Sequence, residues 1–126
     1  MKHPRTYLKC EHCGKIVGVI EEVGPELICC GEAMKKLEAN TTDAATEKHV
    51  PVVVRDGNTI TVTVGSVPHP MTEEHHISWI SVAQDNKTER AMLSHTGSPT
   101  ATFNIDDGDA TVYEYCNLHG LWAVDI

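Results

Sequence analysis

The chain carries metal-donor side chains that are far apart in the sequence, and this constrains the fold more than any other feature. A Cys-x-x-His pair lies near the C-terminal end, and three histidines stand well upstream of it. The five residues are His49, His69, His75, Cys116 and His119. One ion can hold them all only if the loops or strand ends of a folded β-sandwich bring them together. Four imidazoles and one thiolate suit iron, whereas a structural zinc closes at four ligands. Five ligands leave one position open, which indicates redox chemistry.

The Cys-x-x-His pair is stronger evidence for a metal site than the scattered histidines are. A histidine taken alone is more often a surface residue or a hydrogen-bonded core group than a ligand. In a Cys-x-x-His turn, the backbone N–H groups that follow the cysteine can point back at the sulfur and hold both donors toward one ion. Hydrogen bonds of this kind tune the redox potential of a bound metal.

A second group of donors stands near the N-terminal end. It consists of Cys10 and Cys13 in a Cys-x-x-Cys arrangement, then the adjacent pair Cys29 and Cys30. Four thiolates in a tetrahedron suit either zinc or iron, and the spacing alone does not choose between them. We expect the adjacent pair to distort the tetrahedron, because neighbouring side chains on an extended backbone diverge. A disulfide between the two adjacent cysteines is the less favoured alternative, and the odd total of five cysteines also indicates metal ligation.

Length and charge limit the possible classes of protein. A chain of 126 residues holds one ordinary domain and a small appendage. The formal charge of −8 argues against nucleic acid or an anionic membrane as a partner. Neither a signal-peptide core nor a run of about 18 apolar residues is visible, so we expect a soluble, cytoplasmic protein.

The sequence divides near residue 38. Before it, short β-like runs at 6–9, 16–21 and 26–28 are too few to bury a core, so this segment needs a metal staple. Residues 38–46 are polar and predict a linker or a short helical turn. The remainder predicts seven strands, at about 50–55, 59–64, 76–83, 88–94, 101–105, 110–115 and 121–125. Seven short strands with turn residues between them are typical of a sandwich.

Turn residues and alternation support this β assignment. Residues 59–64 alternate threonine with isoleucine or valine, as a half-buried strand does, and Asp56-Gly57 before them is a strong hairpin signal. Asp85-Asn86 and the acidic run 106–109 separate later strands in the same way.

Taken together, these residues resemble the desulfoferrodoxin family, the two-iron superoxide reductases. The N-terminal cysteines resemble desulforedoxin, and the blocks at 47–51, 69–71, 74–75 and 115–120 resemble the catalytic superoxide reductase domain. The resemblance implies a mainly β chain, with a desulforedoxin-like iron-tetrathiolate domain over 1–37 and an immunoglobulin-like seven-stranded sandwich over 38–126. It also implies two iron ions per chain, one Fe(Cys)4 and one Fe(His)4(Cys), the latter square-pyramidal with Cys116 as the axial ligand.

The resemblance further implies an activity and roles for single residues. The expected reaction is the one-electron reduction of superoxide to hydrogen peroxide, a detoxification. Glu47 is implied as the carboxylate that fills the sixth position once the iron is ferric. From its own charge and its place next to His49, Lys48 should attract the anionic substrate. Where the family usually has an aromatic residue, this chain has His76, and we expect His75 to be the ligand. His3, His12 and His95 match no ligand position and are expected at the surface.

Two other classes remain open from the sequence. One is a non-catalytic iron protein for electron transfer or storage, and the other is a zinc-stapled β-sandwich binding module. For Glu47 and Lys48 the alternative is a solvated ion pair. A rubredoxin-like electron donor is the family expectation, and a homodimer is expected because both segments have surface to cover.

Overall fold

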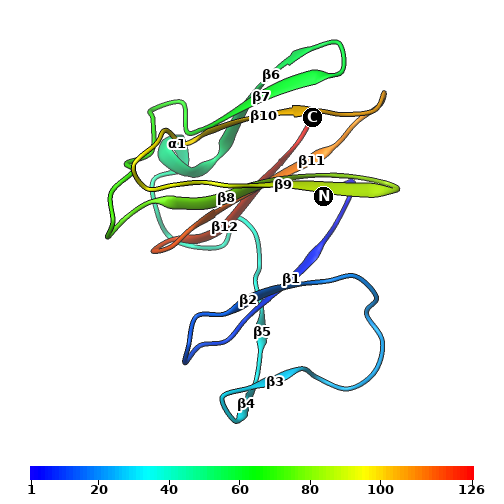
Figure 1. Cartoon of the computed structure of the whole chain (residues 1–126), viewed down its shortest axis with the longest axis vertical. Coiled ribbons are helices and arrows are strands. Elements are labelled where there is room, and N and C mark those ends of the chain that lie inside the picture. The colour runs from blue at the N-terminus through cyan, green and yellow to red at the C-terminus, as the bar shows by residue number, and fades with distance from the viewer. The chain divides into compact units, whose positions relative to one another are not determined.

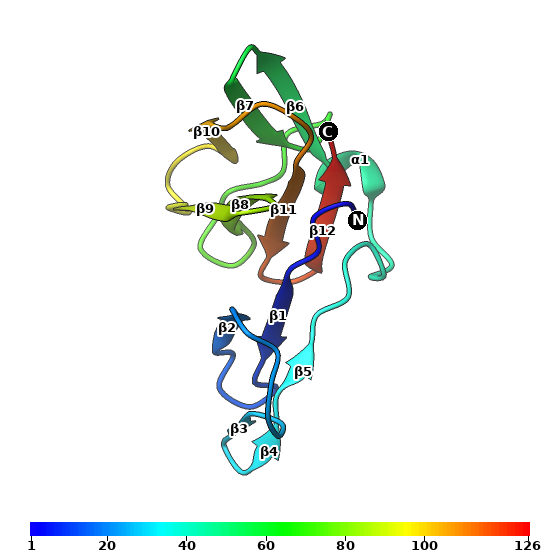
Figure 2. The same ribbon diagram turned by 90° about the vertical axis from the view of Figure 1, so that its right-hand side faces the viewer.

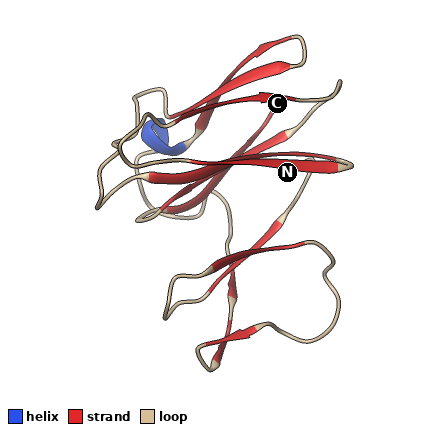
Figure 3. Cartoon of the chain, in the orientation of Figure 1, coloured by secondary structure: helices blue, strands red, loops and turns tan.

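The computed structural model describes residues 1–126, and its regular secondary structure consists of strands and one short helix, joined by loops and turns (Figures 1 and 3). Two compact units make up the chain. Residues 5–38 form one, and residues 1–4 together with 39–126 form the other. The mainly β prediction is therefore confirmed. The helix is far too short and too polar to cross a membrane.

The smaller unit contains five very short strands. Its three-stranded antiparallel sheet has the order β2-β1-β5, from β1 (Thr6–Lys9), β2 (Ile16–Val19) and β5 (Lys35–Lys36). A two-stranded pair follows from β3 (Ile28–Cys29) and β4 (Glu32–Ala33). Only three apolar side chains of this unit are buried, namely Tyr7, Cys10 and Met34. So small a core leaves a bound metal to supply much of the stability.

The larger unit is a sandwich of two antiparallel sheets (Figure 2). The three-stranded sheet has the order β10-β7-β6, from β6 (Pro51–Asp56), β7 (Thr59–Val64) and β10 (Thr100–Asn104). The four-stranded sheet has the order β12-β11-β8-β9, from β8 (Ile77–Gln84), β9 (Lys87–Met92), β11 (Thr111–Cys116) and β12 (Gly120–Asp125). All seven strands lie within two residues of the ranges expected from the sequence.

Alternation along the strands builds the core between the sheets. On β7, Ile60, Val62 and Val64 are fully buried, and the threonines between them face the other way. Ile80 on β8 and Val112 on β11 lie in the same apolar cluster. Burying an aliphatic side chain of this size stabilises a fold by roughly 1.5–3 kcal/mol. The core therefore fixes the strand ends from which the donor loops leave.

The turns and the helix differ only slightly from expectation. Gly57-Asn58 joins β6 to β7, and Asp85-Asn86 joins β8 to β9, each as a two-residue hairpin loop. Helix α1 (Thr46–His49) begins where the predicted polar linker ends, and it includes His49. The first histidine donor therefore lies on the helical turn itself, whereas the sequence placed it after the turn.

His3 contradicts its expected surface position. Its side chain is 8% exposed, and its backbone N–H donates to Thr111 Oγ1 at 3.0 Å. The ring nitrogens lie 3.0 Å from Asp85 Oδ1 and 2.9 Å from Asp109 Oδ1. Two carboxylates satisfy both ring nitrogens, so the ring can be buried as part of the sandwich unit. His12 and His95 are exposed, as expected.

Candidate metal centres

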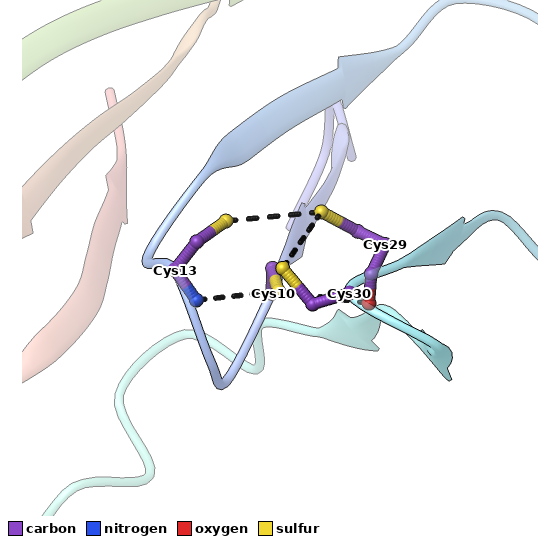
Figure 4. Close-up of side chains that lie close together, drawn as sticks. All are labelled: Cys10, Cys13, Cys29 and Cys30. Carbon is purple, nitrogen blue, oxygen red and sulfur yellow. Dashed lines mark hydrogen bonds between the residues drawn. The ribbon is translucent and has the colours of Figure 1, made fainter.

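The four N-terminal cysteines converge on one point (Figure 4). The sulfur of Cys13 lies 3.7 Å from that of Cys29, which lies 4.0 Å from that of Cys30. A metal bound to four sulfurs at about 2.3 Å places them roughly 3.8 Å apart, so the group fits a tetrahedral ion. All five cysteines of the chain are free, and the alternative of a disulfide between the adjacent pair is wrong.

Left-handed backbone conformations turn the two sulfur pairs toward each other. Cys30 has φ 52° and Gly31 has φ 79°, so the chain reverses directly after Cys29 instead of continuing as a strand. The expected distortion of the tetrahedron assumed an extended backbone at the adjacent pair, and Cys30 does not have one. In the other pair, the Cys13 N–H lies 3.5 Å from Cys10 Sγ, and Gly14 adopts φ 80° to close the turn.

Hydrogen bonds within the cysteine group give its thiols very different pKa values. The hydrogen bond from the Cys13 backbone N–H lowers the pKa of Cys10 to about 6. The pKa of Cys29 is raised to about 12, mainly by the hydrogen bond between its side chain and that of Cys10. Cys10 therefore ionises readily, whereas Cys29 and Cys30 keep their protons. A bound cation would displace these remaining protons and stabilise all four thiolates.

The second group gathers the five expected donors from four parts of the sandwich unit. His49 ends α1, His69 and His75 lie between β7 and β8, Cys116 ends β11, and His119 lies in the turn before β12. The donor atoms of His49, His75, Cys116 and His119 all lie within 4.8 Å of one another. The fifth, His69, places Nε2 3.4 Å from Cys116 Sγ.

Backbone carbonyls orient two of the imidazoles. Nδ1 of His49 donates to the Ala45 carbonyl at 2.7 Å, and Nδ1 of His69 donates to the Pro70 carbonyl at 2.7 Å. A carbonyl can only accept, so each Nε2 keeps its lone pair and faces the group. Nε2 of His49 lies 3.1 Å from Nδ1 of His119. Nε2 of His75 is buried without any hydrogen-bond partner, and a cation at the centre of the group would satisfy it.

Burial keeps the donors in the form that binds metal. Desolvation lowers the pKa of His49 and His75, and it lowers that of His69 to about 4. These imidazoles are therefore neutral at physiological pH. Burial raises the pKa of Cys116, whereas the backbone N–H groups of Leu118 and His119 oppose that rise.

A glycine turn holds the helix that carries His49. Gly65 has φ 85°, and a Cβ there would lie 2.8 Å from the Lys48 carbonyl oxygen and 2.9 Å from that of Glu47. The Val67 N–H donates to the same Glu47 carbonyl at 3.1 Å. Only glycine permits this close approach.

Asn117 clamps the segment that carries His75. Its Nδ2 donates to the Glu74 carbonyl at 2.9 Å, and its Oδ1 accepts from the His76 N–H at 2.8 Å. Its backbone N–H also donates to the His76 carbonyl at 3.2 Å. These bonds bracket His75 on both sides and fix it relative to Cys116. The ring of His76 bonds instead to Thr72, so His75 alone of the pair joins the group.

Sequence reasoning missed two residues near this group. Nothing in the sequence indicated a positioning role for Asn117 except its place inside the Cys-x-x-His turn. Glu114 stands between two tyrosines on β11, a position that reads as solvent-facing, yet it is fully buried and neither carboxyl oxygen has a partner. Burial raises the pKa of Glu114 to about 9, which keeps the carboxyl protonated at neutral pH.

Glu47 and Lys48 both lie on α1 with exposed side chains. After desolvation and hydrogen bonding, their charges are smaller causes of the pKa shift of His49. The Lys48 charge lowers the pKa of His49 and the Glu47 charge raises it.

Comparison with known proteins agrees with both groups. Residues 41–125 match the family described as Desulfoferrodoxin, and residues 5–37 match the one described as Desulfoferrodoxin, N-terminal domain. The chain belongs to the desulfoferrodoxin family. The desulfoferrodoxin of Syntrophotalea carbinolica is 50% identical over 115 residues, which are 91% of each chain.

Solved structures of superoxide reductases resemble this desulfoferrodoxin. The enzyme from Treponema pallidum has a TM-score of 0.78 and 34% identity, and the match covers 96% of this chain and 98% of that one. The one-iron superoxide reductase from Giardia intestinalis has a TM-score of 0.57 and 32% identity over 64% of this chain and 97% of its own. The desulfoferrodoxin resemblance predicted from the sequence is confirmed, and the two donor groups fit the family's two iron ions.

Proposed function

We propose that this desulfoferrodoxin is a superoxide reductase, which converts superoxide, one electron and two protons to hydrogen peroxide. The observation that carries the proposal is the convergence of four imidazoles and one thiolate, with the buried His75 Nε2 left without a protein partner. Five donors leave one of six octahedral positions for a molecule from solution. Turnover requires such a position, whereas a passive electron carrier gains from saturated coordination.

We assign each iron to one part of the chain. The four thiolates hold an Fe(Cys)4 centre in a domain over 1–37. The catalytic iron, in a domain over 38–126, is held by His49, His69, His75, Cys116 and His119. The burial of His49 and His69, the lowered pKa of three of the imidazoles and the single thiolate support this assignment.

The chain's own groups prepare the catalytic site for an anion. When bound, the ferrous ion supplies the one electron of the reaction. Neutral histidines and one thiolate leave a divalent ion with a local charge of about +1, so the site attracts superoxide although the chain carries −8. The exposed Lys48 ammonium adds to that attraction. The thiolate of Cys116 donates electron density to the metal, which favours electron transfer.

Glu47 completes the proposed cycle. Its exposed carboxylate lies on the same helical turn as His49, and we assign it to the sixth position once the iron is ferric. Lys48 thus attracts superoxide to the site, and Glu47 occupies the open position after the electron has been transferred. Both protons of the product come from solvent, to which α1 is open.

We also propose a rubredoxin-like electron donor and a homodimer. On the smaller unit, Ile20 is 98% exposed, Val23 is 80% exposed and Ile28 is 60% exposed. Apolar side chains so exposed favour coverage by a second copy. Sedimentation should give twice the mass of 13.8 kDa at micromolar concentration, and a monomer there would remove the homodimer.

One pair of measurements separates the three candidate classes. Protein purified with its native metals is analysed for iron and zinc and then mixed anaerobically with superoxide. A reductase contains iron and consumes superoxide in many turnovers when an artificial reductant is present. A passive carrier contains iron and is reduced by the reductant but does not speed the loss of superoxide, and a zinc-stapled binding module contains zinc and does neither.

A further inference from the structure

A pair of histidines outside both iron centres forms a further group of metal donors. His76 precedes β8, and His95 lies in the connection between β9 and β10. Their ring centroids are 6.0 Å apart, with 37° between the ring planes. The pair lies within the sandwich unit, and neither ring belongs to the five-donor group.

A backbone carbonyl fixes the tautomer of the His76 ring. Its Nδ1 donates to the Thr72 carbonyl at 2.9 Å, so the lone pair stays on Nε2. His49 and His69 in the five-donor group make the same kind of bond, to the carbonyls of Ala45 and Pro70. Asn117 fixes the backbone of His76 by bonds to its N–H and its carbonyl. The donor atom is thus held by a rigid segment.

The spacing of the two rings suits one shared ion. Each ring centre lies about 3 Å from a metal bound at its nitrogen, so two imidazoles on one ion have centroids roughly 5–6 Å apart. The five-donor group gives an internal measure, since its imidazole pairs lie between 4.6 Å (His69 with His75) and 6.5 Å (His49 with His75). The separation of His76 and His95 falls inside that range.

We propose that His76 and His95 form a site for a divalent transition metal of borderline softness, represented by Zn²⁺. Imidazole suits such ions, and water would complete the coordination because His95 is exposed and His76 half-buried. The exposed carboxylates of Glu73 and Glu74 add negative charge to the same loop. The site does not rest on the proposed function, because none of its donors holds iron.

Calorimetric titration of the fully iron-loaded protein with Zn²⁺ tests the proposal. Iron is quantified before and after, so that displacement of iron is not counted as binding. We expect one further Zn²⁺ per chain with a dissociation constant in the micromolar range. His95→Ala, and separately His76→Phe, should each weaken that binding at least about tenfold, because each removes one of two imidazoles.

His12→Ala is the matched control. It removes a half-exposed imidazole of the smaller unit, which pairs with Glu32, and it should leave the binding of Zn²⁺ unchanged. His95→Ala leaves the segment around His75 intact, so its iron content should equal that of the parent. Zn²⁺ binding that survives both substitutions with parental affinity, or a parent that binds no further Zn²⁺, would overturn the proposal.

Discussion

Single donor residues show how burial prepares a side chain for a cation. His69 is 2% exposed, and burial holds its pKa near 4, so a proton does not compete with metal for Nε2. Cys116 is also fully buried, which raises the pKa of its thiol and makes an unmetallated site retain a proton there. Metal binding at Cys116 therefore releases the proton of that thiol.

Lys48 offers a direct test of electrostatic attraction at the residue scale. Lys48→Ala should slow the encounter with superoxide roughly tenfold and flatten its dependence on ionic strength, because salt screens attraction by a nearby charge. Pulse radiolysis over a range of salt concentrations measures both. Lys87→Ala, at the far end of the β8–β9 hairpin, removes the same charge and should leave the rate nearly unchanged. Parental rate and salt slope in Lys48→Ala would reduce the residue to a solvated surface charge.

Glu47 should affect a different step. Glu47→Ala should leave the encounter with superoxide nearly unchanged but alter the absorption spectrum of the ferric protein, because water or another ligand must then take the sixth position. The same radiolysis experiment, followed by a spectrum of the oxidised protein, measures both quantities. A ferric spectrum identical to that of the parent would mean that the carboxylate does not reach the metal.

Among the elements, the turn after β11 and the loop before β8 depend on each other through Asn117. Asn117→Ala removes the two side-chain bonds that bracket His75, so the imidazole should lose its fixed orientation. We expect the affinity of the second centre for ferrous iron to fall roughly 10–100-fold, as removal of an orienting group typically does. Competition with a chelator measures this, and the first centre should keep its parental affinity.

Asn104→Ala provides the control for that variant. Asn104 is exposed on β10, where its side chain bonds to Thr59 on the neighbouring strand. Its removal should leave the affinity of both centres unchanged. If Asn117→Ala also retained iron as firmly as the parent, the clamp would have no role in positioning His75.

The sequence predicted the elements well because the signals are local. Alternation along β7 and the two-residue turns at Gly57 and Asp85 follow directly from side-chain period and turn chemistry. Local patterns did not predict the left-handed backbone at Cys30. The only nearby sign of it in the sequence is the glycine that follows. Strand ends were displaced by up to two residues for the usual reason that pairing partners decide them.

The features that the sequence did not predict depend on contacts between distant segments. His3 is buried only because Asp85 and Asp109 from two different turns reach its ring. Glu114 is enclosed because β11 is buried on both faces, which alternation within the strand does not reveal. Asn117 acquires its role from a loop that lies 41 residues earlier in the chain. The five donors were predicted as a set, whereas the groups that orient them were not.

At the scale of the whole molecule, the donors divide cleanly between the two units, four cysteines in one and five residues in the other. Cys13→Ser should abolish or alter the first centre, yet superoxide reduction with an artificial reductant should stay within about twofold of the parent. Iron analysis must show the second centre filled. A much slower Cys13→Ser protein with that centre intact would mean that the two centres depend on each other.

Reduction of superoxide without formation of dioxygen is tested most directly by product stoichiometry. Reduced, iron-loaded protein is mixed anaerobically with a known, smaller amount of superoxide, and hydrogen peroxide and dioxygen are both measured. A reductase gives one peroxide for each superoxide and no dioxygen. One peroxide for every two superoxide, with dioxygen released, would show a dismutase and contradict the account.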